Sequence, residues 1–518
     1  MTVVVIGGGH NGLAAAFYLG RAGLKPIVIE QRGTVGGGAI TGELHPGFRC
    51  PTLTHHAAVR SDIAAEMDLA RHGLEVLRPA VDVFIPAPDG PPAVMYMDAN
   101  RTADALRATA PRDAEAYLKY RAAMSAVGDV VDTLLTVPPP DVDQPDSRDL
   151  WNLLTTGRRF RALGKQDGYR LLRWAPMPVA DFATEWFESP LLRAAVCGSG
   201  VSGTMLGPRS AGSTLVHLLR DAHRRLSGGR THVRGGPGAL THAMASAARG
   251  AGADIRVGSR VDRIVVSNGA VTAVTVDGRD IAADAVVSAA DSKATCLGLL
   301  DPIDLSPDFL SKMGNFRSAG TVAKVNLALS GLPSFGATNA ELLSGSIHIG
   351  HDVDFIERAF DHAKYGELSE HPWLEVTIPS VLDPSLVPPG AHVMSVYVHY
   401  APCRLRGAGW DSMKATVLAR ALAVLERHAP GLKALVIAAE VITPADLEST
   451  YGFAGGHMFH GELSIDQLFT MRPLLGFGGY NTPIRGLYLC GGGTHPGGFM
   501  SGSSGKLAVN ALLASLKR

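Results

Sequence analysis

Apolar runs and a glycine-rich turn open the chain in the order of a strand, a helix and a second strand. Residues 3–6 are continuously apolar, which is typical of a buried parallel strand. Residues 13–19 carry apolar side chains at helical spacing, and residues 26–29 form a second short apolar run. This pattern predicts a βαβ unit, the building block of a parallel sheet.

The turn between the first strand and the helix has glycine at each position of a GxGxxG motif. Gly7 permits the tight turn, Gly9 lets the backbone approach a pyrophosphate, and Gly12 lets the helix pack closely on the strand. The helix N-terminus supplies free N–H groups and about half a positive charge, which suits a phosphate. The motif predicts a dinucleotide site. His10 and Asn11 lie inside the turn and either contact the cofactor or only contribute backbone.

Glu30 ends the second strand, where an acidic residue accepts hydrogen bonds from the ribose hydroxyls of adenosine. A carboxylate at this position argues against the 2′-phosphate of NADP. Gly36 and Gly37 follow shortly afterwards, and a second glycine pair here is typical of flavoproteins rather than of NAD dehydrogenases. We therefore expect FAD, held non-covalently, as the cofactor.

A second combination of strand, glycine loop and helix closes the chain. Residues 487–490 predict a short strand, residues 491–505 contain the loop GGGTHPGGFMSGSSG, and residues 506–516 predict the final helix. So many glycines, together with Pro496, indicate backbone that lies close to a large flat ligand. We expect this C-terminal loop to lie beside the flavin ring and its ribityl chain.

The middle of the chain contains a further glycine loop and helix, at residues 235–248. Apolar runs after it predict strands, including a hairpin and a returning strand, at 255–257, 263–266, 271–276 and 281–287. A second GxGxxG, formed by Gly198, Gly200 and Gly203, has no strand before it and no acidic residue at the expected distance after it. We interpret this second motif as a loop.

These segments predict an α/β fold of two interleaved domains. A Rossmann-type FAD-binding domain is expected from residues 1–75, 230–300 and 470–518, and an α+β substrate domain from residues 76–229 and 301–469. The ligand cleft is expected where the two domains meet. Residues 150–176 mix leucine, tryptophan and phenylalanine with arginine and lysine, which predicts a helical lid; contact of this basic amphipathic segment with a membrane surface is the alternative.

Composition narrows the classes of function. The chain has 518 residues with 48 basic and 48 acidic side chains, so no global charge attracts nucleic acid or an anionic membrane. The five cysteines form no CxxC pair, which argues against a disulfide framework and a redox-active dithiol. No metal site is expected, because the histidines lack partners at ligand spacing. We expect a cytoplasmic protein, since the first strand begins at residue 3 and no apolar run reaches the roughly 20 residues of a membrane span.

The two ends of the chain, GGGHNGLAAAFYLGRAG with Glu30 and YLCGGGTHPGGFMSGSSG, resemble the phytoene desaturase-like branch of the FAD-dependent amine oxidase superfamily. Residues 375–393 and 455–473 are similar to the family named pyridine nucleotide-disulfide oxidoreductase domain-containing protein 2, so the resemblance spans nearly the whole chain. It implies hydride transfer between a substrate carbon and flavin N5, with carotenoids, retinoids, fatty acids and amines among the substrates of relatives. It also implies that Val261 meets the flavin adenine. The cofactor-binding residues implied in the C-terminal loop are Gly492, Gly493, Gly497, Gly498, Phe499 and Met500.

Three positions limit what this resemblance implies. Gly38 stands where relatives usually carry an arginine after the second glycine pair. Amine oxidases often have a lysine that holds a water near flavin N5, and Lys324 is a candidate, although we expect a solvated lysine at a strand edge. Cys490 is close enough to the C-terminal loop to be checked for covalent flavin attachment.

Histidines in glycine-rich loops are the candidate acid–base groups, because imidazole titrates near working pH. We select His460 and His495 as candidate catalytic residues, with a positional role as the alternative. His55 and His56 are expected to be core histidines, with a place on the flavin side of the cleft as the alternative.

Three polar residues near 470 have open roles. Asp466 and Gln467 are expected to cap a helix, and substrate contact is the alternative. Arg472 is expected either to bind a phosphate or substrate carboxylate or to form a plain surface ion pair.

The leading function is an FAD-dependent dehydrogenase, desaturase or oxidase that moves hydride from a C–H bond of a lipophilic or amine-type small molecule to flavin. An NAD(P)H-driven flavin reductase or saturase and a non-catalytic FAD-containing partner-binding protein are the alternatives. A nicotinamide site would need a second complete strand, GxGxxG and helix, which the sequence does not offer. The substrate, the direction of transfer, the electron acceptor and the oligomeric state stay open.

Overall fold

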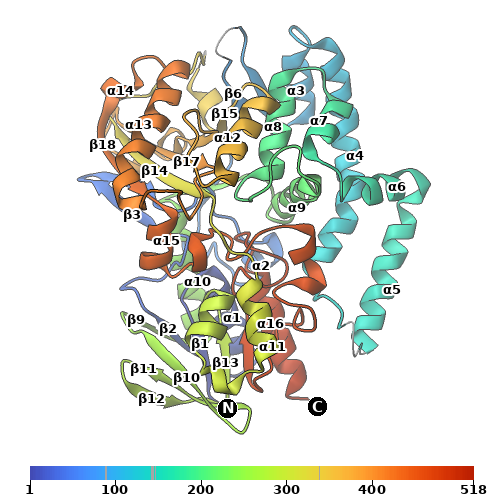
Figure 1. Cartoon of the computed structure of the whole chain (residues 1–518), viewed down its shortest axis with the longest axis vertical. Coiled ribbons are helices and arrows are strands. Elements are labelled where there is room, and N and C mark those ends of the chain that lie inside the picture. Colours follow the sequence, from blue (N-terminus) through green and yellow to red (C-terminus); the bar gives the residue numbers. More distant parts are fainter. Residues whose placement is uncertain (88–89, 142–144, 146, 338, 518) are drawn as a thin grey trace.

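The computed structural model describes the chain apart from residues 88–89, 142–144, 146, 338 and 518. Figure 1 shows a lower body that contains both termini and an upper body that carries most of the helices. The chain passes between the two bodies several times, because strands of one body are separated in sequence by elements of the other.

A five-stranded parallel sheet forms the lower body, with the order β19-β13-β1-β2-β9. Its strands come from the start, the middle and the end of the chain: β1 (Val3–Ile6), β2 (Ile27–Glu30), β9 (Asp254–Val257), β13 (Ala285–Ser288) and β19 (Leu487–Leu489). All five lie in the segments that the sequence assigned to the FAD-binding domain. The predicted α/β class is confirmed, and the domain boundaries stay a prediction.

Helices with many small residues cover one face of this sheet. α1 (His10–Arg21) packs against α10 (Pro237–Gly250) and α16 (Ser503–Ser515). Glycines let backbone approach backbone around α1. A Cβ on Gly12 would lie 2.0 Å from the carbonyl oxygen of Gly7 in the preceding turn, and one on Gly505, on α16, would lie 2.1 Å from the Asn11 carbonyl oxygen. On the other face, a separate apolar cluster joins the sheet to the antiparallel strands β10 (Val261–Ser267), β11 (Ala270–Val276) and β12 (Arg279–Ala282).

A seven-stranded mixed sheet forms the centre of the upper body, with the order β18-β14-β17-β16-β15-β6-β7. Its strands are β6 (Val81–Ile85), β7 (Ala93–Tyr96), β14 (Val322–Leu329), β15 (Ser346–Ile349), β16 (Leu374–Thr377), β17 (His392–His399) and β18 (Val436–Ile442). Every residue of β14 is buried, since it lies between β17 and β18 and packs on the hairpin of β3 (Thr41–His45) and β4 (Phe48–Pro51).

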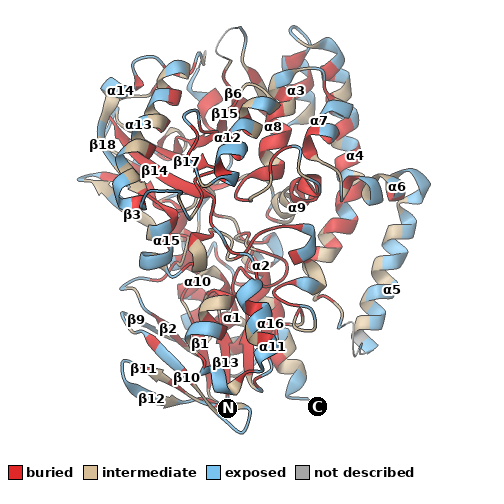
Figure 2. Ribbon diagram, viewed as in Figure 1, coloured by how far each residue is buried: buried red, intermediate tan, exposed pale blue. Residues whose placement is uncertain are grey.

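A helical layer packs beside this sheet around a large apolar cluster. Its main members are α3 (Ala99–Leu106), α4 (Pro111–Thr136), α7 (Val179–Trp186), α8 (Pro190–Val201), α9 (Ser213–Leu226) and α12 (Val353–Lys364). The predicted lid is two helices, α5 (Ser147–Ala162) and α6 (Gly164–Trp174), and α5 projects from the body with exposed residues along it (Figure 2). The remaining elements are α2 (Ser61–Glu66), β5 (Val76–Leu77), β8 (His232–Val233), α11 (Pro307–Asn315), α13 (Trp410–His428), α14 (Leu432–Leu435), α15 (Pro444–Tyr451) and short 3₁₀ or π turns.

The interpretation of the second GxGxxG as a loop was wrong. Gly198 and Gly200 lie inside α8, and only Gly203 follows it, with a positive φ of 76°. These glycines serve packing, because a Cβ on Gly198 would lie 2.7 Å from the Trp373 ring. The close approach of an aromatic ring explains the glycine without a nucleotide.

We predict that Gly12→Ala lowers the thermal unfolding midpoint by roughly 2 °C or more, because the new methyl group clashes with the Gly7 carbonyl oxygen in the turn after β1. The matched control is Gly33→Ala, since a Cβ there meets nothing within 4 Å. Circular dichroism melts of both variants test this. Equal midpoints would show that α1 does not depend on this close contact.

Candidate functional site

A cavity of about 620 Å³ extends from the GxGxxG turn to the face of the seven-stranded sheet. Its lining comes from both bodies: Gly9 and Glu30 lie at one end, and Lys324, Glu375 and Tyr397 belong to strands of the upper sheet. A ligand in this cavity would therefore touch the Rossmann-type sheet and the α+β body at once.

Gly8 and Gly9 of the first turn pack against the second glycine pair, Gly36 and Gly37. Gly36 N–H donates to the Gly8 carbonyl (2.9 Å), and a Cβ on Gly9 would lie 3.6 Å from the Gly37 Cα. Gly9 is the N-cap of α1, so the free N–H groups of that helix begin at the cavity. The result is bare backbone on two sides at a helix N-terminus, which suits an anionic group such as a pyrophosphate.

Glu30 is buried beside this turn at the end of β2. Its carboxylate accepts hydrogen bonds from the Gly8 N–H (2.7 Å) and the Arg32 N–H (2.9 Å), which fix its position at the cavity wall. Carboxylate oxygens have room for further donors, so the geometry is compatible with ribose hydroxyls.

Most of the predicted site residues lie together at this cavity. Those that line it are Gly7, Gly9, His10, Asn11, Glu30, Gly37, Val261, His460, Gly492, Gly498, Phe499 and Met500. Gly12, Gly36, Gly493, Gly497 and His495 lie behind the lining, where Gly12 and Gly36 shape the turn. Their roles toward a cofactor stay a prediction.

The two candidate catalytic histidines lie in different surroundings. His460 lines the cavity, and its Nδ1 lies 3.8 Å from Oδ2 of Asp291, a residue that sequence reasoning missed. Burial lowers the pKa of His460 to about 4 and raises that of Asp291 to about 7, so the pair prefers to be uncharged. His495 lies outside the lining, where its Nε2 is 2.9 Å from the Leu134 carbonyl oxygen. This position fits the positional alternative for His495.

Arg472 has neither of its expected roles. It is fully buried, and burial lowers its pKa to about 10. Its guanidinium donates to the backbone carbonyls of Thr494, Glu462, Gln467, Phe459, Gly461 and Gly492. Arg472 thus ties the C-terminal glycine loop to residues 459–467.

Asp466 and Gln467 cap no helix of eight residues or more, because they sit in a three-residue 3₁₀ turn, Ile465–Gln467. Asp466 pairs with the Arg317 guanidinium (2.7 Å), and Gln467 Oε1 accepts from the Arg317 N–H (2.6 Å). Neither residue lines the cavity, so the expectation of helix capping is replaced by a loop-fixing role.

The expectation of a solvated Lys324 was wrong. The side chain is 3% exposed on β14, and its Nζ lies 4.5 Å from the centre of the Tyr397 ring. Burial lowers the pKa of Lys324 to about 7. Sequence reasoning failed here because β14 is an interior strand covered by the hairpin of β3 and β4, which only the assembled sheet reveals.

His55 and His56 both line the cavity, and their place on its flavin side stays a prediction. The His55 ring stacks on Tyr397 with centroids 3.7 Å apart, and His56 Nε2 lies 2.6 Å from the Arg230 guanidinium. Sequence reasoning missed the polar and charged groups around them: Arg220, Arg230, His348, Glu375 and Tyr397. The available signal was polar residues that alternate with apolar ones in a short strand, as in SIHI and LEVT.

Comparison with known proteins gives the family. Residues 187–513 match the family described as flavin containing amine oxidoreductase, and residues 5–67 match the NAD(P)-binding Rossmann-like domain. The chain belongs to the flavin-containing amine oxidoreductase family. The function predicted from the sequence, an FAD-dependent oxidoreductase, is confirmed at this level, and the family implies a flavin cofactor.

Individual relatives cover the whole length of the chain. It is 34% identical to the pyridine nucleotide-disulfide oxidoreductase domain-containing protein 2 of Rattus norvegicus, over 99% of this chain and 93% of the relative. It is 27% identical to the phytoene desaturase (lycopene-forming) of Pseudescherichia vulneris, over 99% of both chains. Among solved structures, an oxidoreductase from Methanosarcina mazei superposes with a TM-score of 0.63 at 16% identity, covering 99% of this chain and 100% of that one. The predicted resemblance to both families is confirmed.

The cysteines of this oxidoreductase do not support disulfide chemistry, whatever the name of the rat relative suggests. All five are free, and none lines the cavity. Across the described residues, no group of three or more His, Cys, Asp or Glu side chains is arranged to hold a metal ion. No helix in the same residues has the length and apolar character to span a membrane.

We predict that Lys324→Met raises the thermal unfolding midpoint by roughly 3 °C at about pH 6.5 and by less at about pH 9.5. The folded-state pKa of Lys324 is lowered from 10.5 to about 7. The cost of burying its ammonium group is therefore fully present below about pH 7 and is lost as the pH rises toward about 10.5.

Thermal melts of wild type and variant at both pH values measure this difference. The control is Lys312→Met, because Lys312 is 61% exposed and pairs with Asp308 on its own helix. A midpoint gap that stays constant with pH would contradict the lowered pKa of Lys324.

Proposed function

We propose that this oxidoreductase binds FAD non-covalently in the cavity and dehydrogenates a C–C or C–N bond of a small organic molecule. The observation that carries the proposal is the continuity of the cavity. It begins at Gly9 and Glu30, passes the C-terminal loop at Gly492 and Phe499, and ends at the sheet that carries Lys324.

The residues present fit FAD at each end. The glycines at positions 9 and 37 leave backbone bare where a pyrophosphate would lie, and a side chain at Gly9 would fill that space. Glu30 would hold the ribose, and Val261, at the start of β10, lines the wall beside it. The absence of cysteine from the lining, Cys490 included, supports non-covalent attachment.

A bound flavin would supply the hydride acceptor that oxidation of a C–H bond requires. The protein then has to orient the bond, exclude water and hold or move a proton. Asp291 and His460 line the cavity with Oδ2 and Nδ1 free of hydrogen bonds. Asp291, with a pKa of about 7, can take a proton from a substrate in reach when its carboxyl group is ionised. The Lys324 ammonium group is the other titratable group with a pKa near neutrality on the lining, at about 7.

The phytoene desaturase relative supports C–C dehydrogenation, and the family description supports C–N dehydrogenation. The NAD(P)H-driven reductase stays the second candidate function. Against it, only one strand, GxGxxG and helix unit occurs among the described residues, and the second GxGxxG is part of α8.

We propose a cytoplasmic location, with α5 as a surface of peripheral membrane contact. Large apolar side chains on this projecting helix are about half exposed or more: Leu150, Trp151, Leu153 and Leu154. Arg158, Arg159 and Arg161 follow on the same helix, and apolar and basic groups together suit an anionic lipid surface.

We predict that Gly9→Leu abolishes flavin retention and leaves the fold intact. The backbone of Gly9 is extended, with φ −75° and ψ 173°, and its Cβ would meet only the Gly37 backbone at 3.6 Å or beyond. The leucine would therefore occupy pyrophosphate space without a backbone clash. Absorbance spectra after reconstitution with FAD measure retention, and circular dichroism checks the fold. Gly33→Leu is the matched control, and a Gly9→Leu protein with full flavin absorbance would refute the assignment.

We predict that the oxidised flavin band persists under anaerobic conditions after addition of NADPH, because the electrons come from an organic substrate. The test is an absorbance time course of the FAD-loaded protein. Prompt bleaching with NADPH would favour the reductase over the dehydrogenase.

A further inference from the structure

A row of polar side chains crosses the face of the upper sheet that lines the cavity. The residues are Lys324 on β14, Tyr397 on β17, Glu375 on β16 and His348 on β15, and we call them the polar row. Each is directly paired with the next in the strand register: Lys324 with Tyr397, Tyr397 with Glu375, and Glu375 with His348. Directly paired residues point to the same face of a sheet, so the row is one continuous surface.

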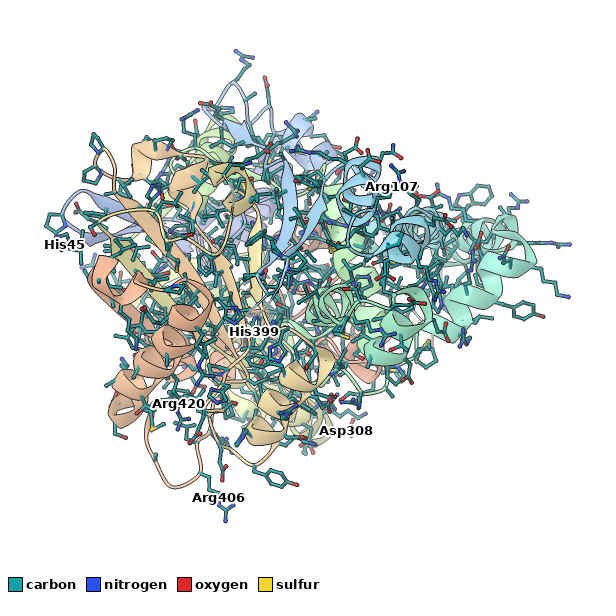
Figure 3. The ribbon with its side chains drawn as sticks, turned by 90° about the horizontal axis from the view of Figure 1, so that it is seen from above. His45, Arg107, Asp308, His399, Arg406 and Arg420 are labelled. Carbon is teal, nitrogen blue, oxygen red and sulfur yellow. The ribbon has the colours of Figure 1, made fainter. Side chains whose placement is uncertain are left out.

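The polar row lies deep inside the molecule. Figure 3 shows His399, two residues beyond Tyr397 on the same strand, in the interior, whereas Arg107, Asp308 and Arg406 lie toward the outside. Lys324, Glu375 and His348 are at most 6% exposed. Polar groups this deep are costly unless they have partners.

Several nitrogen atoms around the row have no hydrogen-bond partner. Lys324 Nζ, both ring nitrogens of His348 and both ring nitrogens of His55 are buried without a hydrogen bond. Arg220, on α9, lines the same cavity and makes one long contact, from its guanidinium to the Ser202 carbonyl oxygen (3.4 Å). Within the described residues, no carboxylate lies within ion-pair distance of Arg220 or Lys324.

Positive charge exceeds negative charge around this row. Asp82 is shared by Arg224 and Arg230, and Asp221 is shared by Arg121 and Arg224. Each of these two carboxylates therefore already pairs with at least two arginines. Glu375 is the acidic member of the row. Its Oε2 accepts a hydrogen bond from the Ser202 hydroxyl (3.2 Å) and lies 3.6 Å from His399 Nε2.

Arg220 interacts electrostatically with His348 and Glu375 of the polar row, although it forms no ion pair with a described residue. Its charge contributes to the lowered pKa values of His348 and Glu375, which places it within electrostatic reach of the row. A guanidinium presents parallel N–H donors that match the two oxygens of a carboxylate.

We propose that the substrate is an organic carboxylic acid whose carboxylate binds to Arg220 and Lys324 over the polar row. The inference rests on the proposed function, because this end of the cavity is where a substrate would meet the cofactor. One carboxylate supplies the acceptors that Lys324 and Arg220 lack and balances part of the excess charge. Tyr397, His55 and the apolar Ala195 and Val196 supply walls for the rest of an organic acid.

The experiment is isothermal titration calorimetry of the FAD-loaded protein with benzoate, benzamide and inorganic phosphate as probes. We expect benzoate to bind at least tenfold more tightly than benzamide, which has the same shape without the charge, and more tightly than phosphate. Arg220→Met should weaken benzoate binding by tenfold or more and leave benzamide unchanged. Lys324→Met should also weaken benzoate binding, which provides a second variant at a different strand.

Arg209→Met is the matched control, because Arg209 is exposed and pairs with Asp354 (2.6 Å) away from the cavity. It should bind benzoate as the wild type does. Equal binding of benzoate and benzamide, tighter binding of phosphate, or unchanged benzoate binding in Arg220→Met would each overturn the proposal. The flavin band recorded on the same samples tests the proposed function separately, since a protein that keeps the band and does not bind benzoate contradicts this proposal alone.

Discussion

Backbone contact around α1 is the constraint on which the rest of the structure depends. The helix follows its N-cap Gly9, touches the β1 turn through Gly12 and meets α16 at the Asn11 backbone, where Gly505 has no side chain. This contact forces the last helix of the chain to lie against the first. It therefore brings the C-terminal loop next to the N-terminal turn and closes the nucleotide end of the cavity.

The upper body holds charged side chains inside an apolar core. Asp82 and Asp221 neutralise Arg224 and its neighbours, but no carboxylate of the described residues pairs with Arg220 or Lys324. A buried cation without a counterion is unfavourable. In an enzyme such a cation can serve binding, because an anionic substrate forms the ion pair that no carboxylate of the protein forms.

Sequence reasoning predicted the lower body well because its signals are local. A strand, a GxGxxG turn and a helix at Val3–Arg21 define their own geometry, and the C-terminal strand and loop repeat that logic. The polar row of the upper body was not predicted, since its four residues come together only through the register of separate strands. The sequence pattern also gave wrong roles to residues whose position depends on packing. Gly198 of α8 accommodates the Trp373 ring, and Arg472 binds backbone carbonyls rather than an anion.

A crystal structure of the FAD-loaded protein tests the central claim most directly. The account predicts the adenosine beside Glu30 and Val261, the pyrophosphate at the N-terminus of α1, and the flavin ring beside the C-terminal loop, facing Lys324. A flavin bound elsewhere, or a ring turned away from the sheet that carries Lys324, would contradict it.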